Sequence, residues 1–214
     1  MDLIVGGGNY GARATRYLVG RGREFIVVDP DPECPAAAEI HDPGIGRLLV
    51  GGMETVCQVI HDHHPEQIFP TAPVHVAAGL VCEAGGFSES PDDIQGFRHC
   101  VPPELVLGIR GSSVYFSLNR DIPCIPDCPS PDTCPVTGED RTIPLYDRLR
   151  QLLPGAFILE SVQVAPGLGA LRGNDISDLF RQARGKKRVC IGTACRCHGV
   201  VTGLKAEFHS GGTA

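Results

Sequence analysis

The sequence predicts an α/β protein with a Rossmann-like parallel sheet and a second, smaller, cysteine-rich α/β domain. Three observations support this fold class. Short apolar runs alternate with helix-periodic segments over about the first 85 residues. A glycine turn joins the first run to the first helical segment, as in dinucleotide-binding folds. The rest of the chain loses this alternation and gathers several cysteines into two short segments.

The chain begins with a strand–turn–helix–strand unit. Residues 2–5 (DLIV) form an apolar run, and the segment GGGNYG follows it. Residues 12–22 have helical spacing, and residues 24–29 (EFIVVD) are typical of a strand buried on both faces. This unit is the first βαβ step of a doubly wound sheet. The same alternation predicts, in order, a strand over 47–52, a helix over 53–64, a strand over 66–73 and a helix over 74–85.

Residues 86–108 are polar and interrupted by proline and glycine, so we place a domain boundary there. Residues 1–95 are the expected Rossmann domain, and residues 96–214 are the expected smaller domain. The second domain should contain a strand starting at 113, a helix over 143–153, a strand over 156–164, a glycine-rich turn over 166–173, a helix over 174–187, and a strand, a cysteine turn and a strand or helix over 188–206.

Composition and charge exclude several classes of protein. The net charge is −6 and the pI is near 5.7, so nothing favours binding to nucleic acid or to an anionic membrane. No apolar run is long enough to span a bilayer, and the N-terminus lacks the pattern of a signal peptide. We therefore expect a cytoplasmic protein without membrane insertion. Cytoplasmic thiols are mostly reduced, so the cysteines favour metal or redox chemistry over a disulfide framework.

The glycine turn has the spacing of a dinucleotide site. Gly6, Gly8 and Gly11 fit G-x-G-x-x-G between a strand and a helix, and Asp29 ends the next strand. An acid in that position binds the ribose diol, and no lysine or arginine follows it directly to bind a 2′-phosphate. The pattern thus favours NAD(H) over NADP(H). The expected dinucleotide site comprises Gly6, Gly8, Asn9, Tyr10, Gly11, Asp29, Thr71 and Pro73.

A resemblance to a known family supports the same site. Residues 4–18 (IVGGGNYGARATRYL) and 25–33 (FIVVDPDPE) resemble the NAD-binding domain of potassium-uptake regulators, the TrkA-N or RCK type. The resemblance covers about the first 85 residues. It implies NAD(H) on the glycine turn, the adenosine ribose on Asp29, and a sensor that acts on a protein partner. Whether the protein forms a homodimer is left open by the sequence.

The chain departs from that family in two places. Gly51-Gly52-Met53 stands where the family commonly has Gly-Asp after its third strand, and the second half does not resemble the family's ligand-sensing domain. A role in potassium transport is therefore not carried over. The Val-Gly-Gly-Gly start also resembles the siroheme-type precorrin dehydrogenases, although their N-terminal extension is missing here.

Two cysteine segments predict a metal site. One has the spacing C-x3-C-x5-C, and the other has C-x4-C-x-C-H. Thiolates are preferred ligands for zinc and for iron–sulfur clusters, but neither spacing is the usual one for either centre. The expected ligands are Cys124, Cys128, Cys134, Cys190, Cys195, Cys197 and His198. A thiol–disulfide switch at Cys195 and Cys197, a structural zinc and simple packing are the alternatives.

Two functions follow from these motifs. One is an NAD(H)-binding sensor or regulator with a cysteine-ligated metal or iron–sulfur centre. The other is an NAD(H)-linked oxidoreductase or electron-transfer protein. The sequence contains no recognisable acid–base pair or nucleophile constellation, which favours the sensor.

Overall fold

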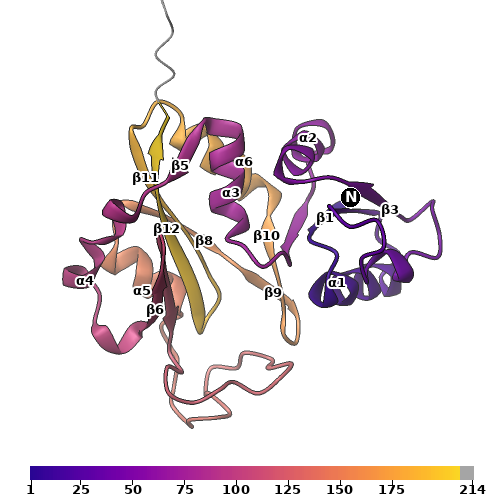
Figure 1. The fold of residues 1–214 in the computed structure, drawn as a ribbon. Helices are drawn as coiled ribbons and strands as arrows, with labels where there is room; N and C mark the ends of the chain where they lie inside the picture. Colours follow the sequence, from indigo (N-terminus) through magenta and orange to yellow (C-terminus); the bar gives the residue numbers. More distant parts are fainter. Residues whose placement is uncertain (208–214) are drawn as a thin grey trace, which may run out of the picture.

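A computed structural model describes residues 1–207 of the chain, which form two six-stranded mixed sheets with helices between and around them (Figure 1). The protein therefore has the α/β class that the sequence predicts. No helix within the described residues is long and apolar enough to cross a membrane.

The first sheet begins with a Rossmann-like parallel half. Its strand order is β3-β2-β1-β4-β10-β9, and the first four strands are parallel. The strands are β1 (Asp2–Val5), β2 (Phe25–Asp29), β3 (Gly46–Val50), β4 (Gln67–Pro70), β9 (Val162–Ala165) and β10 (Leu168–Arg172). Strand β10 pairs antiparallel with β4, so a hairpin from late in the sequence completes the sheet.

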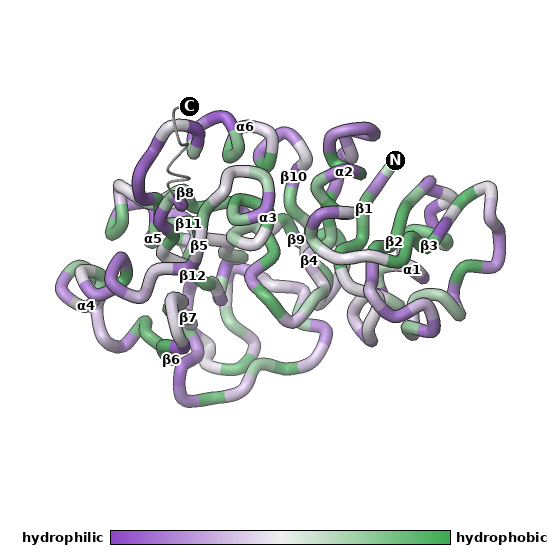
Figure 2. Tube along the Cα trace, turned by 45° about the horizontal axis from the view of Figure 1, so that its top comes forward, coloured by the Kyte–Doolittle hydropathy of each residue, from purple (hydrophilic) through white to green (hydrophobic). Residues whose placement is uncertain are grey.

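Alternating apolar residues bury both faces of this sheet. Ile4, Val27 and Phe69 pack on one side against α1 (Asn9–Gly20), whose Ala14 and Leu18 are fully buried. The other side packs against three helices: α2 (Met53–His63), α3 (Val76–Gly85) and α6 (Gly173–Ala183). Figure 2 shows the hydrophobic stretches of β1 and β2 in this interior. Burial on both faces explains why these strands are continuous apolar runs.

The second sheet has the order β6-β7-β12-β11-β8, and β5 pairs with β12 outside this path. Only the β8–β11 pair is parallel among its described pairings. The strands are β5 (Phe87–Glu89), β6 (Val106–Arg110), β7 (Ser113–Ser117), β8 (Ala156–Glu160), β11 (Arg188–Ala194) and β12 (His198–Ala206).

One hydrophobic core joins the two sheets. Residues of β1, β2 and β4 share it with α3 and α6 and with Val189, Ile191 and Leu204 of the second sheet. Figure 1 shows α3 and α6 between the sheets. Helix α5 (Leu145–Leu152) packs against the second sheet in a separate core through Leu145 and Leu149. The molecule is thus layered as helix, sheet, helices, sheet and helix.

Short helical segments complete the connections. The 3₁₀ turns are η1 (Ala37–Glu39), η2 (Pro91–Ile94) and η3 (Pro103–Leu105), and α4 (Phe97–Cys100) is a single helical turn. They lie in the turn-rich stretch after β2 and in the stretch around residue 95. The boundary at residue 95 stays a prediction. The chain returns to the first sheet in β9 and β10, so the two sheets do not correspond to two uninterrupted segments.

The structure differs from the predicted elements of the second half in three places. Strand β6 lies in a stretch where the sequence predicts no strand, since the first strand predicted for this half starts at residue 113. The strand expected over 156–164 is two strands in different sheets, β8 and β9, interrupted at Ser161. The glycine turn expected over 166–173 is mostly strand β10, because only Gly167 has a positive φ, +65°, and the apolar residues after it pair with β4 and β9. Single-sequence periodicity does not separate these cases, because the pairing partners are distant in the chain.

The long segment between β7 and α5 is the predicted cysteine loop. Residues 118–144 contain turns and one isolated bridge, between Thr133 and Asp140, within the described chain. We call residues 118–144 the cysteine loop below. Figure 1 shows it below the second sheet, extending toward the β9–β10 turn.

Candidate functional site

The glycine turn has the backbone that a dinucleotide site requires. Gly6 has φ +99° and its N–H donates to the carbonyl of Val28 at 2.9 Å. A Cβ on Gly11 would lie 2.1 Å from the carbonyl oxygen of Gly6, so only glycine lets α1 approach β1 this closely. Gly8 is the N-cap residue of α1, and a Cβ there would project into open space. The exposed helix N-terminus is therefore accessible to an anionic group.

Asp29 lies beside this turn, at the end of β2, as expected. Its carboxylate accepts the N–H groups of Gly7 at 2.6 Å and of Asp31 at 2.8 Å. Each carboxylate oxygen retains acceptor capacity, so a ribose diol would share Asp29 with the backbone. The segment after β2 also contacts the turn, because the N–H of Ala36 donates to Gly7 O at 2.8 Å.

Thr71 and Pro73 follow β4 at the same edge. The hydroxyl of Thr71 lies 2.6 Å from Gly6 O and 3.0 Å from Val5 O, so it holds the glycine turn in place. Pro73 is exposed. Asn9 and Tyr10 are exposed at the start of α1, and Tyr10 is 65% exposed.

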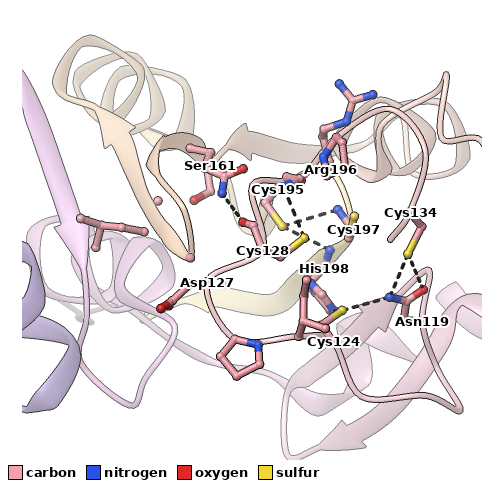
Figure 3. A pocket seen from close by; sticks show the side chains of 18 of the residues that line it. Asn119, Cys124, Asp127, Cys128, Cys134, Ser161, Cys195, Arg196, Cys197 and His198 are labelled. Atoms are coloured by element: carbon pink, nitrogen blue, oxygen red, sulfur yellow. Dashed lines mark hydrogen bonds between the residues drawn. The ribbon is translucent and has the colours of Figure 1, made fainter. Parts of the chain in front are cut away.

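The structure brings the two cysteine segments to one cavity of about 770 Å³. The expected ligands that line it are Cys124, Cys128, Cys134, Cys195, Cys197 and His198. Figure 3 shows these side chains around one hollow between the cysteine loop and the turn before β12. Cys190 does not line it. Cys190 lies within β11, and its thiol is 3.8 Å from the carbonyl oxygen of Asp93. Burial raises the pKa of this thiol to about 11.

Backbone hydrogen bonds fasten the cysteine loop beside the second cysteine segment. The N–H of Leu118 donates to Cys197 O at 2.9 Å, and the N–H of Leu145 donates to Arg196 O at 2.8 Å. The middle of the loop contacts the first sheet, because the side-chain amide of Gln163 donates to Cys128 O at 2.6 Å. The cavity is thus built where both sheets and the loop meet.

Two of the thiols share one amide group. The Nδ2 of Asn119 lies 3.0 Å from the Cys124 sulfur and 3.6 Å from the Cys134 sulfur. The Cys124 sulfur also lies 3.4 Å from Nε2 of His198. Asn119 is almost fully buried and is the second residue after β7. Side chains from both cysteine segments therefore converge at this end of the cavity.

Tight turns donate backbone N–H groups to the remaining sulfurs. The N–H of Ser130 lies 3.3 Å from the Cys128 sulfur, and the N–H groups of Cys197 and His198 lie 3.5 and 3.3 Å from the Cys195 sulfur. Burial alone would raise the pKa of Cys134, but hydrogen bonds from Thr137, Val136 and Asn119 lower it to about 6. Thiolates are the form that binds metals.

The thiols are not already assembled as a metal cage. Within residues 1–207, no group of three or more His, Cys, Asp or Glu side chains is close enough to hold a metal ion as it stands. A metal would therefore require the cysteine loop to close around it. The cavity wall also includes Tyr10 and Arg13 of α1, which follow the glycine turn. The cavity thus reaches from the first turns of α1 to the cysteines, whereas the glycines of the turn and Asp29 do not line it.

Sequence reasoning missed several residues of this cavity. Asn119, Ser161 and Gln163 line it, yet no motif marks them. Ser161 and Gln163 reach it because the chain changes sheets between β8 and β9, and no local pattern predicts that change. Arg141 is beside the cysteines in sequence, which is the only signal for its position in the wall.

Comparison with known proteins places the chain in a family. A family model described as the C-terminal domain of an uncharacterized protein, AF_1314, matches residues 48–207, and the model of the corresponding N-terminal domain matches residues 1–76. The chain belongs to the AF_1314 family. A relative from Archaeoglobus fulgidus, described as an uncharacterized protein, is 41% identical over 217 residues. The alignment covers 96% of this chain and 99% of the relative, so the similarity extends over nearly the whole of both chains.

Proposed function

We propose that this AF_1314-family protein binds NAD(H) at the glycine turn and a metal ion or iron–sulfur cluster at the cysteines. One observation carries the proposal: a single cavity is lined by Tyr10 and Arg13 of α1 and by five of the cysteines. A dinucleotide held at the turn would approach the thiols only where it passes Tyr10 and Arg13 of α1.

The residues present fit both groups. Gly8 leaves open space at the N-terminus of α1, and Asp29 retains acceptor capacity for a ribose. The sulfurs of Cys128 and Cys195 accept backbone N–H groups, and hydrogen bonds lower the pKa of Cys134 to about 6. An iron–sulfur cluster would supply one-electron chemistry, whereas zinc would supply structural closure of the cysteine loop.

The leading role is that of a sensor or regulator, in which NAD(H) and the cysteine centre together set the state of a protein partner. The resemblance to the TrkA-N type supports the dinucleotide half of this role. The exposed N-terminus of α1 and the long cysteine loop offer surfaces that ligand binding would order. We do not extend the proposal to potassium transport.

A second function is favoured by the continuity of the cavity. In an oxidoreductase or electron-transfer protein, the dinucleotide and the cysteine centre must lie close together. The common wall formed by α1 and the cysteine segments meets this condition. Turnover of NADH with an added electron acceptor would distinguish this function from the sensor.

The test uses protein purified without oxygen. We expect elemental analysis to find iron or zinc in the wild type, and NADH fluorescence to report saturable binding. Cys128→Ser should lose most of the metal, because its sulfur lies in the cavity. Cys57→Ser is the matched control: the Cys57 thiol lies 3.9 Å from Leu80 O, away from the cavity, and burial raises its pKa to about 11. Equal metal content in both variants would contradict the metal half of the proposal.

A further inference from the structure

The cavity contains a buried arginine whose hydrogen bonds are incomplete. Arg141 lies in the cysteine loop, lines the cavity, and is only 2% exposed. Its Nη2 donates to Asn119 Oδ1 and lies 3.5 Å from Thr137 Oγ1. Among the described residues, its Nε and Nη1 have no partner. Buried guanidinium groups are normally paired, because removing the charge from water is unfavourable.

Nearby carboxylates do not satisfy this charge. The nearest ion pair joins Arg141 Nη2 to Glu139 at 3.8 Å, and the Glu139 side chain is 69% exposed. The contact is long and uses the nitrogen that already donates to Asn119. Nε and Nη1 are therefore buried N–H donors that no described group of the protein satisfies.

A second arginine adds to this excess of donors. Arg196 lines the same cavity, and its Nη2 donates to the carbonyl of Arg141 at 2.9 Å and to Asp132. Within residues 1–207, its buried Nε also has no partner. The third arginine of the wall, Arg13, is paired with Asp127 and with the carbonyl of Pro166. The spare donors thus belong to Arg141 and Arg196, beside the cysteines.

We propose that the cavity binds a small organic oxyanion, a carboxylate or a phosphate ester, through Arg141 and Arg196. Guanidinium groups recognise both oxyanions with charge-assisted hydrogen bonds. The volume of about 770 Å³ exceeds what an inorganic anion fills, so the anionic group would belong to a larger molecule. Ser161, Gln163 and His198 in the same wall offer further polar contacts to that molecule.

This inference goes beyond the dinucleotide and the metal, and it does not require either of them. The ligand would lie next to the Cys124 and Cys134 sulfurs, because Asn119 contacts both of these thiols and Arg141. In a redox protein this ligand would be the substrate, and in a sensor it would be the effector.

The experiment titrates the full-length chain with inorganic phosphate, a monophosphate ester, acetate and succinate by calorimetry, with and without bound metal. We expect one class of oxyanion to bind with a saturable 1:1 isotherm. Comparing the two phosphate ligands with acetate and succinate shows whether the site prefers a phosphate or a carboxylate group. Competition by NADH would show that the oxyanion is part of the dinucleotide, and this would overturn a separate ligand.

Variants test the assignment to the arginines. Arg141→Lys keeps the charge but not the planar donor geometry, so binding should weaken about tenfold or more. Arg181→Gln is the control, because Arg181 is exposed on α6 and paired with Asp178 outside the cavity. If Arg141→Lys does not fold, Arg196→Lys provides the same comparison. No oxyanion binding by the wild type, or unchanged affinity in the folded lysine variants, would overturn the proposal.

Discussion

His75 is a half-buried histidine whose two ring nitrogens both have hydrogen-bond partners within the protein. It precedes α3, and its Nδ1 lies 2.7 Å from Thr202 Oγ1 while its Nε2 lies 3.2 Å from Thr193 Oγ1. Both threonines belong to the second sheet, so His75 links the connection after β4 to that sheet. Its imidazole makes no hydrogen bond to the backbone of α3, so both ring nitrogens are satisfied by the second sheet.

Burial lowers the pKa of His75 from 6.5 to about 4. The unfolded chain therefore binds more protons than the folded protein between these values, and the free energy of unfolding falls as the pH drops through that window. The contribution, about 3 kcal/mol in full, is present above pH 6.5 and is lost toward pH 4. His75→Gln should reduce this pH-dependent loss, because glutamine does not titrate.

Urea unfolding of the wild type and His75→Gln at several pH values from 7 down to about 4.5 measures this difference. Comparing the two proteins cancels the carboxylates that titrate in the same range. The prediction is wrong if both proteins lose the same free energy of unfolding over this interval.

At the scale of elements, the C-terminal end of helix α2 requires a backbone conformation that its residue disfavours. His64 is the C-cap residue with φ +46°, in the left-handed region that favours glycine. His64→Gly should therefore raise the free energy of unfolding by about 0.5–1 kcal/mol. His63→Gly, at the last residue of the helix, is the control; it also removes the contact with Arg47 and should lower the free energy of unfolding by about 0.5 kcal/mol or more.

Thermal and urea unfolding of the two variants provides the measurement. Opposite signs at adjacent histidines would show that backbone conformation, and not loss of the imidazole, determines the effect. Destabilisation by both substitutions would contradict the assigned cap.

At the scale of the whole molecule, the shared core predicts that the two sheets unfold together. Leu171 of β10 is fully buried in this core, which also contains Val189 and Ile191 of the second sheet. Leu171→Ala should lower the free energy of unfolding by about 2–5 kcal/mol. Leu107→Ala is the control, since Leu107 is 53% exposed, and it should change the value by less than about 0.5 kcal/mol.

Amide hydrogen exchange tests whether both sheets are destabilised by Leu171→Ala. We expect Leu171→Ala to reduce amide protection both in β2 of the first sheet and in β12 of the second. Loss of protection confined to the first sheet would show that the sheets are independent units.

Local pattern was sufficient for much of the fold. The elements of the first 85 residues lie where the alternation of apolar runs and helical spacing predicts them, with small shifts at their ends. Gly6 has the positive φ, and Gly11 the close contact between α1 and β1, that their spacing requires. These features depend on the residues themselves and on near neighbours in the chain, so the sequence predicts them well.

The candidate site was only partly predictable. The two cysteine segments do meet, but Cys190 lies apart from the cavity because β11 continues through it and points its thiol toward Asp93. Asn119 and Gln163 carry no sequence signal, since their roles depend on contacts across many residues. The incomplete hydrogen bonding of Arg141 likewise becomes visible only in the folded chain.

The sequence by itself determined the fold class, the glycine turn and the presence of two thiol-rich segments, because periodicity, glycine conformation and residue chemistry are local properties. Only the tertiary structure decided that β9 and β10 complete the first sheet, that the two sheets share one core, and that the cavity joins α1 to the cysteines and Arg141. The physical reason is that long-range strand pairing and burial place these residues together, and no short stretch of sequence contains that information.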